Sequence, residues 1–174
     1  MISLLRRIIR AFAGPEPRLC WPHGHFRSVM AELNRRGEDR HEAGAFLLGE
    51  RQGACAIVRD VVYYDDLDPH AYDQGICILN GYTFGQAWAL CRERQLEVVG
   101  DVHTHRAGVG QSESDRTNPM LALSGHLAVI VPRFARSPLK PMDLGIYEYL
   151  GNHEWRSHGG RRCKSFLSFK GVRP

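Results

Sequence analysis

Residues 98–105 have the sequence Val-Val-Gly-Asp-Val-His-Thr-His and carry the strongest signal for the fold and chemistry of this chain. The valines predict a β-strand over Leu96–His103. Side chains two residues apart in a strand point to the same face, so His103 and His105 present two imidazoles side by side. Zinc accepts imidazole nitrogens at roughly 2.0–2.1 Å, which lets such a pair chelate a metal ion. By itself, the pair is also compatible with two histidines that decorate an edge strand.

The segment after this strand adds a carboxylate. Residues 106–111 are polar and contain glycine, which favours a loop, and Ser112 then suits the N-cap of a helix with Asp115 in its first turn. Two histidines and one carboxylate leave the fourth tetrahedral position for water, as in catalytic zinc sites. The alternative is that Ser112 only caps the helix and that Asp115 only complements the helix dipole.

A hydrolytic zinc site also needs a base that is not a tight metal ligand. Glu42 opens the otherwise apolar segment Ala43–Gly49, where a charge is unusual unless it meets a partner such as a metal-bound water. The alternative is that Glu42 is simply the solvated residue before a strand. The other histidines are expected to be surface or hydrogen-bonded residues, although His41 is adjacent to Glu42.

The remaining periodicity predicts helices mixed with strands and without strict βαβ alternation. This pattern indicates an α+β fold with a mixed, mainly antiparallel sheet flanked by helices. Helices are expected over His23–Arg36 and Thr83–Arg94 and after Ser112; strands are expected over Ala43–Gly49, Ala56–Tyr64, Cys77–Asn80, Leu96–His103, His126–Val131, Leu144–Leu150 and His153–Ser157.

The N-terminal segment is expected to be an appendage of the domain. Residues 2–12 place apolar side chains on one helical face and arginines on the other, and the prolines after Gly14 end that helix. We therefore expect residues 1–17 to form an amphipathic helix with a proline-rich link, and residues 18–174 to form the main domain. The helix could pack on its own domain, dock a partner or lie on a membrane surface.

Composition excludes several classes of protein. The 174 residues suit one domain, and neither a spanning apolar run nor a secretory signal is evident, so the predicted location is cytoplasmic. The five cysteines lack close pairs, and we expect buried free thiols rather than a disulfide framework. The net charge of +4 comes from scattered basic residues, which argues against a nucleic-acid partner.

Taken together, these motifs resemble the JAB1/MPN/Mov34 (JAMM) metalloproteases over roughly residues 23–150. The family pattern is an upstream glutamate, then His-x-His, then a serine followed three residues later by an aspartate. Glu42 begins a stretch similar to the family's Glu-x-x-Gly-x-Leu-x-Gly, with Ala45 at the first glycine position. Two departures are that six rather than seven residues separate His105 from Ser112, and that Arg106 replaces the usual proline.

The resemblance implies an MPN/JAB fold, which is cytidine-deaminase-like, and one Zn²⁺ per chain bound by His103, His105 and Asp115. It implies Glu42 as the general base and Ser112 as a donor to the oxyanion of the tetrahedral intermediate. The implied activity is that of a metalloprotease acting on peptide or isopeptide bonds.

Substrate alternatives stay open at this point. The resemblance implies cleavage after the C-terminus of a ubiquitin-like protein in a bacterial conjugation or antiphage defence pathway, with the conjugation enzymes as further partners. Arg106, together with Arg133 and Arg136 of the proline-rich loop 132–142, would contact that substrate, unless the loop is a plain connector. The alternatives are a processing peptidase for a sulfur-carrier protein or cell-wall peptide, and a non-catalytic MPN scaffold.

Overall fold

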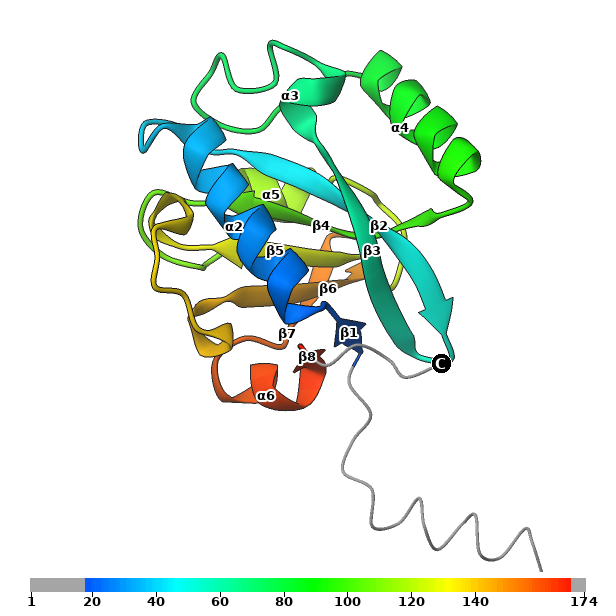
Figure 1. The fold of residues 1–174 in the computed structure, drawn as a ribbon, viewed down its shortest axis with the longest axis vertical. Coiled ribbons are helices and arrows are strands. Elements are labelled where there is room, and N and C mark those ends of the chain that lie inside the picture. Colours follow the sequence, from blue (N-terminus) through cyan, green and yellow to red (C-terminus); the bar gives the residue numbers. More distant parts are fainter. Residues whose placement is uncertain (1–17, 170–174) are drawn as a thin grey trace, which may run out of the picture.

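The computed structural model describes residues 18–169, which form one curled eight-stranded sheet with helices on both faces (Figure 1). The strands are β1 (Leu19–Cys20), β2 (Gly44–Gln52), β3 (Cys55–Tyr63), β4 (Glu97–Thr104), β5 (Leu127–Val131), β6 (Gly145–Gly151), β7 (Glu154–Ser157) and β8 (Leu167–Ser168). The helices are α2 (His23–Gly37), α3 (Tyr64–Leu67), α4 (Gly81–Arg94), α5 (Glu113–Thr117) and α6 (Cys163–Phe166), with short 3₁₀ turns η1 (Arg133–Ala135), η2 (Pro141–Asp143) and η3 (Gly160–Arg162).

The sheet has the strand order β7-β6-β5-β4-β2-β3-β1-β8, which places β4 in its interior. β4 pairs antiparallel with β2 on one side and parallel with β5 on the other. The whole sheet is mixed, because β1 also runs parallel to both β3 and β8 while the remaining pairs are antiparallel. The strand that carries the two histidines is therefore held from both sides.

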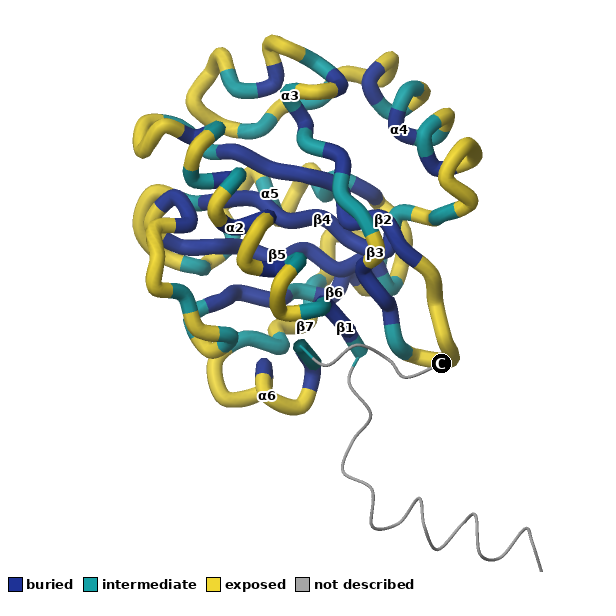
Figure 2. Tube along the Cα trace, viewed as in Figure 1, coloured by how far each residue is buried: buried dark blue, intermediate teal, exposed yellow. Residues whose placement is uncertain are grey.

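Alternation along β2 separates two apolar layers. Ala45 and Leu47 face a core that includes the buried side of α2, whereas Phe46 and Leu48 face a second core that includes α4. The central strands are buried almost throughout their length, and the exposed residues gather on the outer sides of the helices and in the loops (Figure 2). Burial on both faces explains why these strands have nearly continuous apolar sequences.

Gly49 is needed where β2 and β3 change register. The pairing shifts between Leu48 and Gly49, and a Cβ built on Gly49 would lie 1.8 Å from the backbone oxygen of Ile57. Only a residue without a side chain permits this close approach of two backbones.

Most of the elements expected from the sequence are confirmed, including the α+β class and the mixed sheet. One of the expected strands needs correction. Residues 77–80 do not form a strand, because this segment pairs with no strand of the described sheet, and its residues 77–79 line a cavity instead. The helix expected after Ser112 is confirmed as α5, which is five residues long. The amphipathic helix expected over residues 2–12 lies outside the described residues, so the division at residue 17 stays a prediction.

The expectation of free thiols is wrong for two of the five cysteines. Cys20 and Cys55 are joined by a disulfide, with their Cα atoms 6.6 Å apart, while Cys77, Cys91 and Cys163 are free. The pair forms because β1 and β3 are parallel neighbours, with Leu19 opposite Ala56. The sequence separation of 35 hides this proximity in the sequence.

Between residues 18 and 169, no helix combines the length and apolar content required to cross a lipid bilayer.

Candidate metal centre

The two histidines come from the end of β4. Gly44 of β2 lies opposite His103, and the backbone of Thr104 donates to Ala43 O at 2.9 Å. His105 follows the strand, and its N–H donates to Val131 O of β5 at 2.8 Å. Because both neighbouring strands fix the backbone, the two imidazoles are held on the same face, with Nε2 atoms 3.1 Å apart.

Asp115 is brought to the histidines by a capping box at the start of α5. The Ser112 side chain accepts a hydrogen bond from Asp115 N at 3.1 Å, and the Asp115 carboxylate accepts one from Ser112 N at 2.6 Å. This reciprocal pair fixes the aspartate rotamer. Asp115 Oδ1 then lies 3.4 Å from His103 Nε2, and Oδ2 lies 3.3 Å from His105 Nε2.

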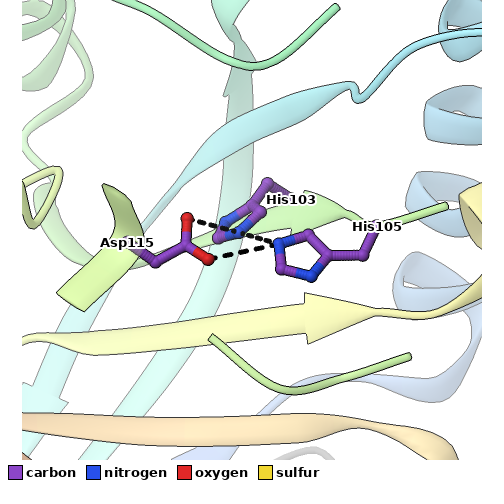
Figure 3. A group of neighbouring side chains, drawn as sticks. All are labelled: His103, His105 and Asp115. Carbon is purple, nitrogen blue, oxygen red and sulfur yellow. Dashed lines mark hydrogen bonds and ion pairs between the residues drawn. The ribbon is translucent and has the colours of Figure 1, made fainter. Parts of the chain in front are cut away.

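The three side chains converge in a geometry that fits a tetrahedral metal ion (Figure 3). Two ligands of one zinc ion, each at roughly 2.0–2.1 Å, lie roughly 3.3–3.4 Å apart. The three observed separations between donor atoms are 3.1, 3.4 and 3.3 Å. The donor set of two imidazoles and one carboxylate also suits a divalent transition metal.

The electrostatics of the cluster follow from burial and mutual hydrogen bonding. Burial opposes ionisation of Asp115, but its bonds with His103 and His105 hold the pKa of its carboxyl far below the usual range. Burial likewise opposes charge on His103, but bonds with Asp101 and Asp115 raise its pKa to about 10. Metal binding at His103 Nε2 therefore requires the release of a proton at neutral pH.

Glu42 lies beside this cluster without joining it. Its Oε1 is 3.8 Å from His105 Nε2, and its side chain is only 20% exposed. Burial raises the pKa of Glu42 above the usual value, and the nearby His103 and His105 partly offset this effect. A carboxylate with a raised pKa next to a metal site suits a group that accepts and returns a proton.

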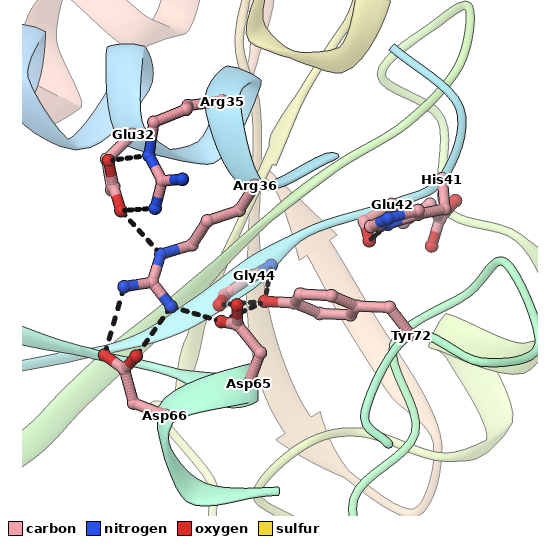
Figure 4. A network of polar contacts seen from close by, with 9 residues as sticks. All are labelled: Glu32, Arg35, Arg36, His41, Glu42, Gly44, Asp65, Asp66 and Tyr72. Carbon is pink, nitrogen blue, oxygen red and sulfur yellow. Dashed lines mark hydrogen bonds and ion pairs between the residues drawn. The ribbon is translucent and has the colours of Figure 1, made fainter. Parts of the chain in front are cut away.

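A polar network fixes the segment that joins Glu42 to the start of β2 (Figure 4). The Tyr72 hydroxyl accepts from Gly44 N at 3.1 Å and lies 3.1 Å from Asp65 Oδ1. Arg36 of α2 donates to Asp65 at 2.6 Å, and the ring of His41 stacks on Tyr72 with centroids 5.2 Å apart. Three separate segments therefore hold the start of β2 in place.

A cavity of about 700 Å³ opens next to the cluster. Its polar lining includes Glu42, His103, Ser112 and Asp115, and its volume is in the range of ligand-binding pockets. The apolar part of the wall comes from the segment 76–79 and from Phe84, Pro119, Met120 and Trp155.

The three arginines expected to contact substrate do not line this cavity. Arg106 and Arg133 are exposed, and Arg136 is paired with Asp39 at 2.6 Å. Their proposed role in substrate binding stays a prediction.

The structure adds three polar residues that the sequence pattern did not single out for the site. Asp101 lines the cavity two residues before His103, and strand alternation could have indicated it. His126 lies 2.6 Å from Asp101, and nothing in its local sequence reveals that contact. Gln111 also lines the cavity, and its Nε2 atom is buried without a hydrogen-bond partner among the described residues.

Comparisons with known proteins give a distant relative and two similar folds. The chain is 22% identical over 135 residues to a probable metalloprotease, y4jG, from Sinorhizobium fredii, covering 77% of this chain and 83% of the relative. It resembles the solution structure of a Desulfitobacterium hafniense protein with a TM-score of 0.60 at 17% identity, covering 87% of this chain and 94% of that one. A Salinibacter ruber protein gives a TM-score of 0.50 at 20% identity, covering 78% and 88%.

The two structural likenesses bear on the fold alone. No protein-family model matches the chain, so membership of the JAMM family stays a prediction from the motif.

Proposed function

We propose that this chain is a metal-dependent peptidase of the JAMM type, with zinc held by His103, His105 and Asp115 and with Glu42 as the general base. The observation that carries the proposal is the convergence of the three donor groups at tetrahedral separations, with the Glu42 carboxylate 3.8 Å from His105. The distant relationship to a protein named a probable metalloprotease supports the class of reaction.

The chemistry divides between the metal and the chain. When bound, zinc polarises the scissile carbonyl and lowers the pKa of water. Glu42 accepts the proton of the attacking water and delivers it to the leaving amine. The Ser112 oxygen is engaged as a helix cap, but its hydroxyl hydrogen remains available to donate to the carbonyl oxygen of the substrate.

For the substrate, we propose the C-terminus of a ubiquitin-like protein, either as a precursor or conjugated through an isopeptide bond in a bacterial conjugation or defence pathway. The support is the motif resemblance, together with a cavity that is lined by metal-ligand candidates and by apolar side chains. Arg106, Arg133 and Arg136 would meet acidic groups of that partner outside the cavity.

The test compares wild type with Glu42→Gln and with Glu113→Gln, a carboxylate that lines the same cavity at an exposed position. Metal content after dialysis and cleavage of ubiquitin-like fusions are measured on each protein. Glu42→Gln is expected to retain stoichiometric zinc and to lose turnover by roughly 10²–10⁴-fold, while Glu113→Gln keeps both. Loss of zinc in Glu42→Gln would make Glu42 a ligand, and unchanged turnover would reject it as the base.

The choice of substrates separates the remaining alternatives. Cleavage of a ubiquitin-like fusion without cleavage of short peptides supports the proposal. The opposite preference favours a processing peptidase for cell-wall peptides, and cleavage confined to a sulfur-carrier precursor favours that substrate. Zinc binding without hydrolysis of any of these substrates, or no zinc binding, favours a non-catalytic scaffold.

A further inference from the structure

A second polar layer lies directly behind the metal-ligand cluster. Asp101 is 1% exposed and His126 is 3% exposed, so both polar groups are removed from solvent. Asp101 Oδ1 lies 2.6 Å from His126 Nε2, and Asp101 Oδ2 lies 3.4 Å from His103 Nδ1. The carboxylate thus sits between two imidazoles, only one of which belongs to the cluster.

The backbone holds this layer in register. Asp101 pairs with Ala128 across the parallel strands β4 and β5, and His126 lies two residues before Ala128. The His126 N–H donates to Leu123 O at 2.9 Å, and its carbonyl accepts from Tyr149 N at 2.9 Å. The His126 ring therefore approaches Asp101 from a position fixed by the sheet.

A buried carboxylate between two imidazoles has a definite effect on the tautomer of His103. In the neutral imidazole, which is the form that binds a metal, a hydrogen on Nδ1 donated to Asp101 leaves the lone pair of His103 on Nε2. That Nε2 atom is the one that faces His105 and Asp115, at 3.1 and 3.4 Å. Carboxylates behind metal-bound histidines raise metal affinity in this way, and their loss typically costs roughly 10–100-fold.

We propose that His126 is a positioning residue for the metal centre: it anchors Asp101, and Asp101 in turn fixes the orientation and tautomer of His103. Burying Asp101 without His126 would leave one of its oxygens unpaired in a dry environment, which favours rotation of the carboxylate away from His103. The inference rests on the proposed metal centre and extends it to residues that do not touch the metal.

The test measures zinc affinity by chelator competition for wild type, Asp101→Asn, His126→Leu and His126→Gln. Leucine at position 126 removes the hydrogen-bond donor to Asp101, whereas glutamine keeps an N–H donor at a similar distance from the backbone. Asp101→Asn and His126→Leu are each expected to weaken zinc binding at least roughly tenfold, with His126→Gln largely restoring it. In the Asp101→Asn background, His126→Leu is expected to have no additional effect on affinity, because His126 acts through Asp101.

His158 provides the matched control. It forms another partly buried histidine–carboxylate pair, with Nε2 2.9 Å from Oε2 of Glu148. His158→Leu should lower the free energy of unfolding without changing zinc affinity. The visible spectrum of the cobalt-substituted protein gives a readout of ligand geometry that general destabilisation does not alter.

The outcomes separate this inference from the proposed function. If wild type binds no zinc, the metal centre itself is rejected. If wild type binds zinc and the Asp101 and His126 variants bind it equally well, the positioning role is rejected while the centre stands. An equal loss of affinity in His158→Leu would also reject it. Should His126→Leu fail to fold, His126→Asn replaces it as the variant whose amide is too short to reach Asp101.

Discussion

The Glu42 carboxylate lies 3.8 Å from His105 Nε2, although 62 residues separate them in the chain. The contact follows from the antiparallel register in which Gly44 faces His103, because continuing that register by two residues brings Glu42 level with His105. The pairing of β2 with β4 therefore places the candidate base, Glu42, next to the candidate metal ligands His103 and His105. A shift of one residue in this pairing would turn the Glu42 side chain to the opposite face of the sheet.

Removing the charge of Asp115 should empty the metal site. Asp115→Asn loses one anionic ligand, so zinc measured after dialysis should be well below stoichiometric. Asp143→Asn is the control, because Asp143 also accepts from its N-cap backbone, Lys140 N, at 2.8 Å, but lies in η2. Full zinc occupancy in Asp115→Asn would contradict its role as a ligand.

Two substitutions of Ser112 separate its capping role from a role in catalysis. Ser112→Ala removes the acceptor for Asp115 N and should cost about 1 kcal/mol of stability. Ser112→Asn keeps a capping oxygen, so zinc binding should be retained, but the loss of the hydroxyl donor should lower kcat by roughly 10²–10³-fold. Near-normal kcat in Ser112→Asn would show that Ser112 serves only as a cap.

Gly49→Ala should destabilise the sheet. The added Cβ would lie 1.8 Å from Ile57 O, and relieving that contact requires the two backbones to separate, at a cost of roughly 1–3 kcal/mol. Gly85→Ala in α4 is the control, because its Cβ meets open space and should add roughly 0.5–1 kcal/mol of stability. Urea unfolding of both variants measures the difference, and equal stabilities would contradict the packing around Gly49.

Acid should weaken the contact between Glu32 and its arginine neighbours. Hydrogen bonds from Arg35, and then from Arg36, lower the pKa of Glu32 from 4.5 to about 2. Because the pKa is depressed in the folded state, the contribution is complete above pH 4.5 and disappears as the pH falls toward 2. Glu32→Gln should thus lower the free energy of unfolding by on the order of 1 kcal/mol at pH 7 and by almost nothing when the pH approaches 2.

Breaking the Cys20–Cys55 disulfide should lower stability. The bond closes a loop with a sequence separation of 35, and the double substitution to serine should cost roughly 3–4 kcal/mol in the chain-entropy model. Thiol titration of the unfolded protein is expected to count the three free cysteines before reduction and all five after it. Five thiols without reductant would contradict the bond.

Features set by local patterns could be predicted from the sequence. The apolar spacing in residues 23–36 and the glycine after it define α2 almost to the residue. Alternation in β4 places His103 and His105 on one face, and the three-residue spacing from Ser112 to Asp115 is that of a capping box. Each of these three features depends only on residues that are close together in the sequence, within a few helical turns or along a single strand.

Other features depended on which strands lie side by side. Asp101 and His126 meet only because β4 and β5 run parallel, and Cys20 meets Cys55 only because β1 inserts between β3 and β8. The segment 77–80 resembles a strand locally, but it has no neighbouring strand in the described sheet, and its residues 77–79 line the cavity.

The sequence by itself therefore determined the pair of histidines, the capped aspartate and the strand that follows Glu42, because short-range periodicity fixes which way those side chains point. Only the tertiary structure decided that the two histidines and the aspartate converge, that Glu42 lies 3.8 Å from His105, and that a buried Asp101–His126 pair lies behind them. The physical reason is that strand pairing and register depend on contacts across the whole sheet, which no local pattern specifies.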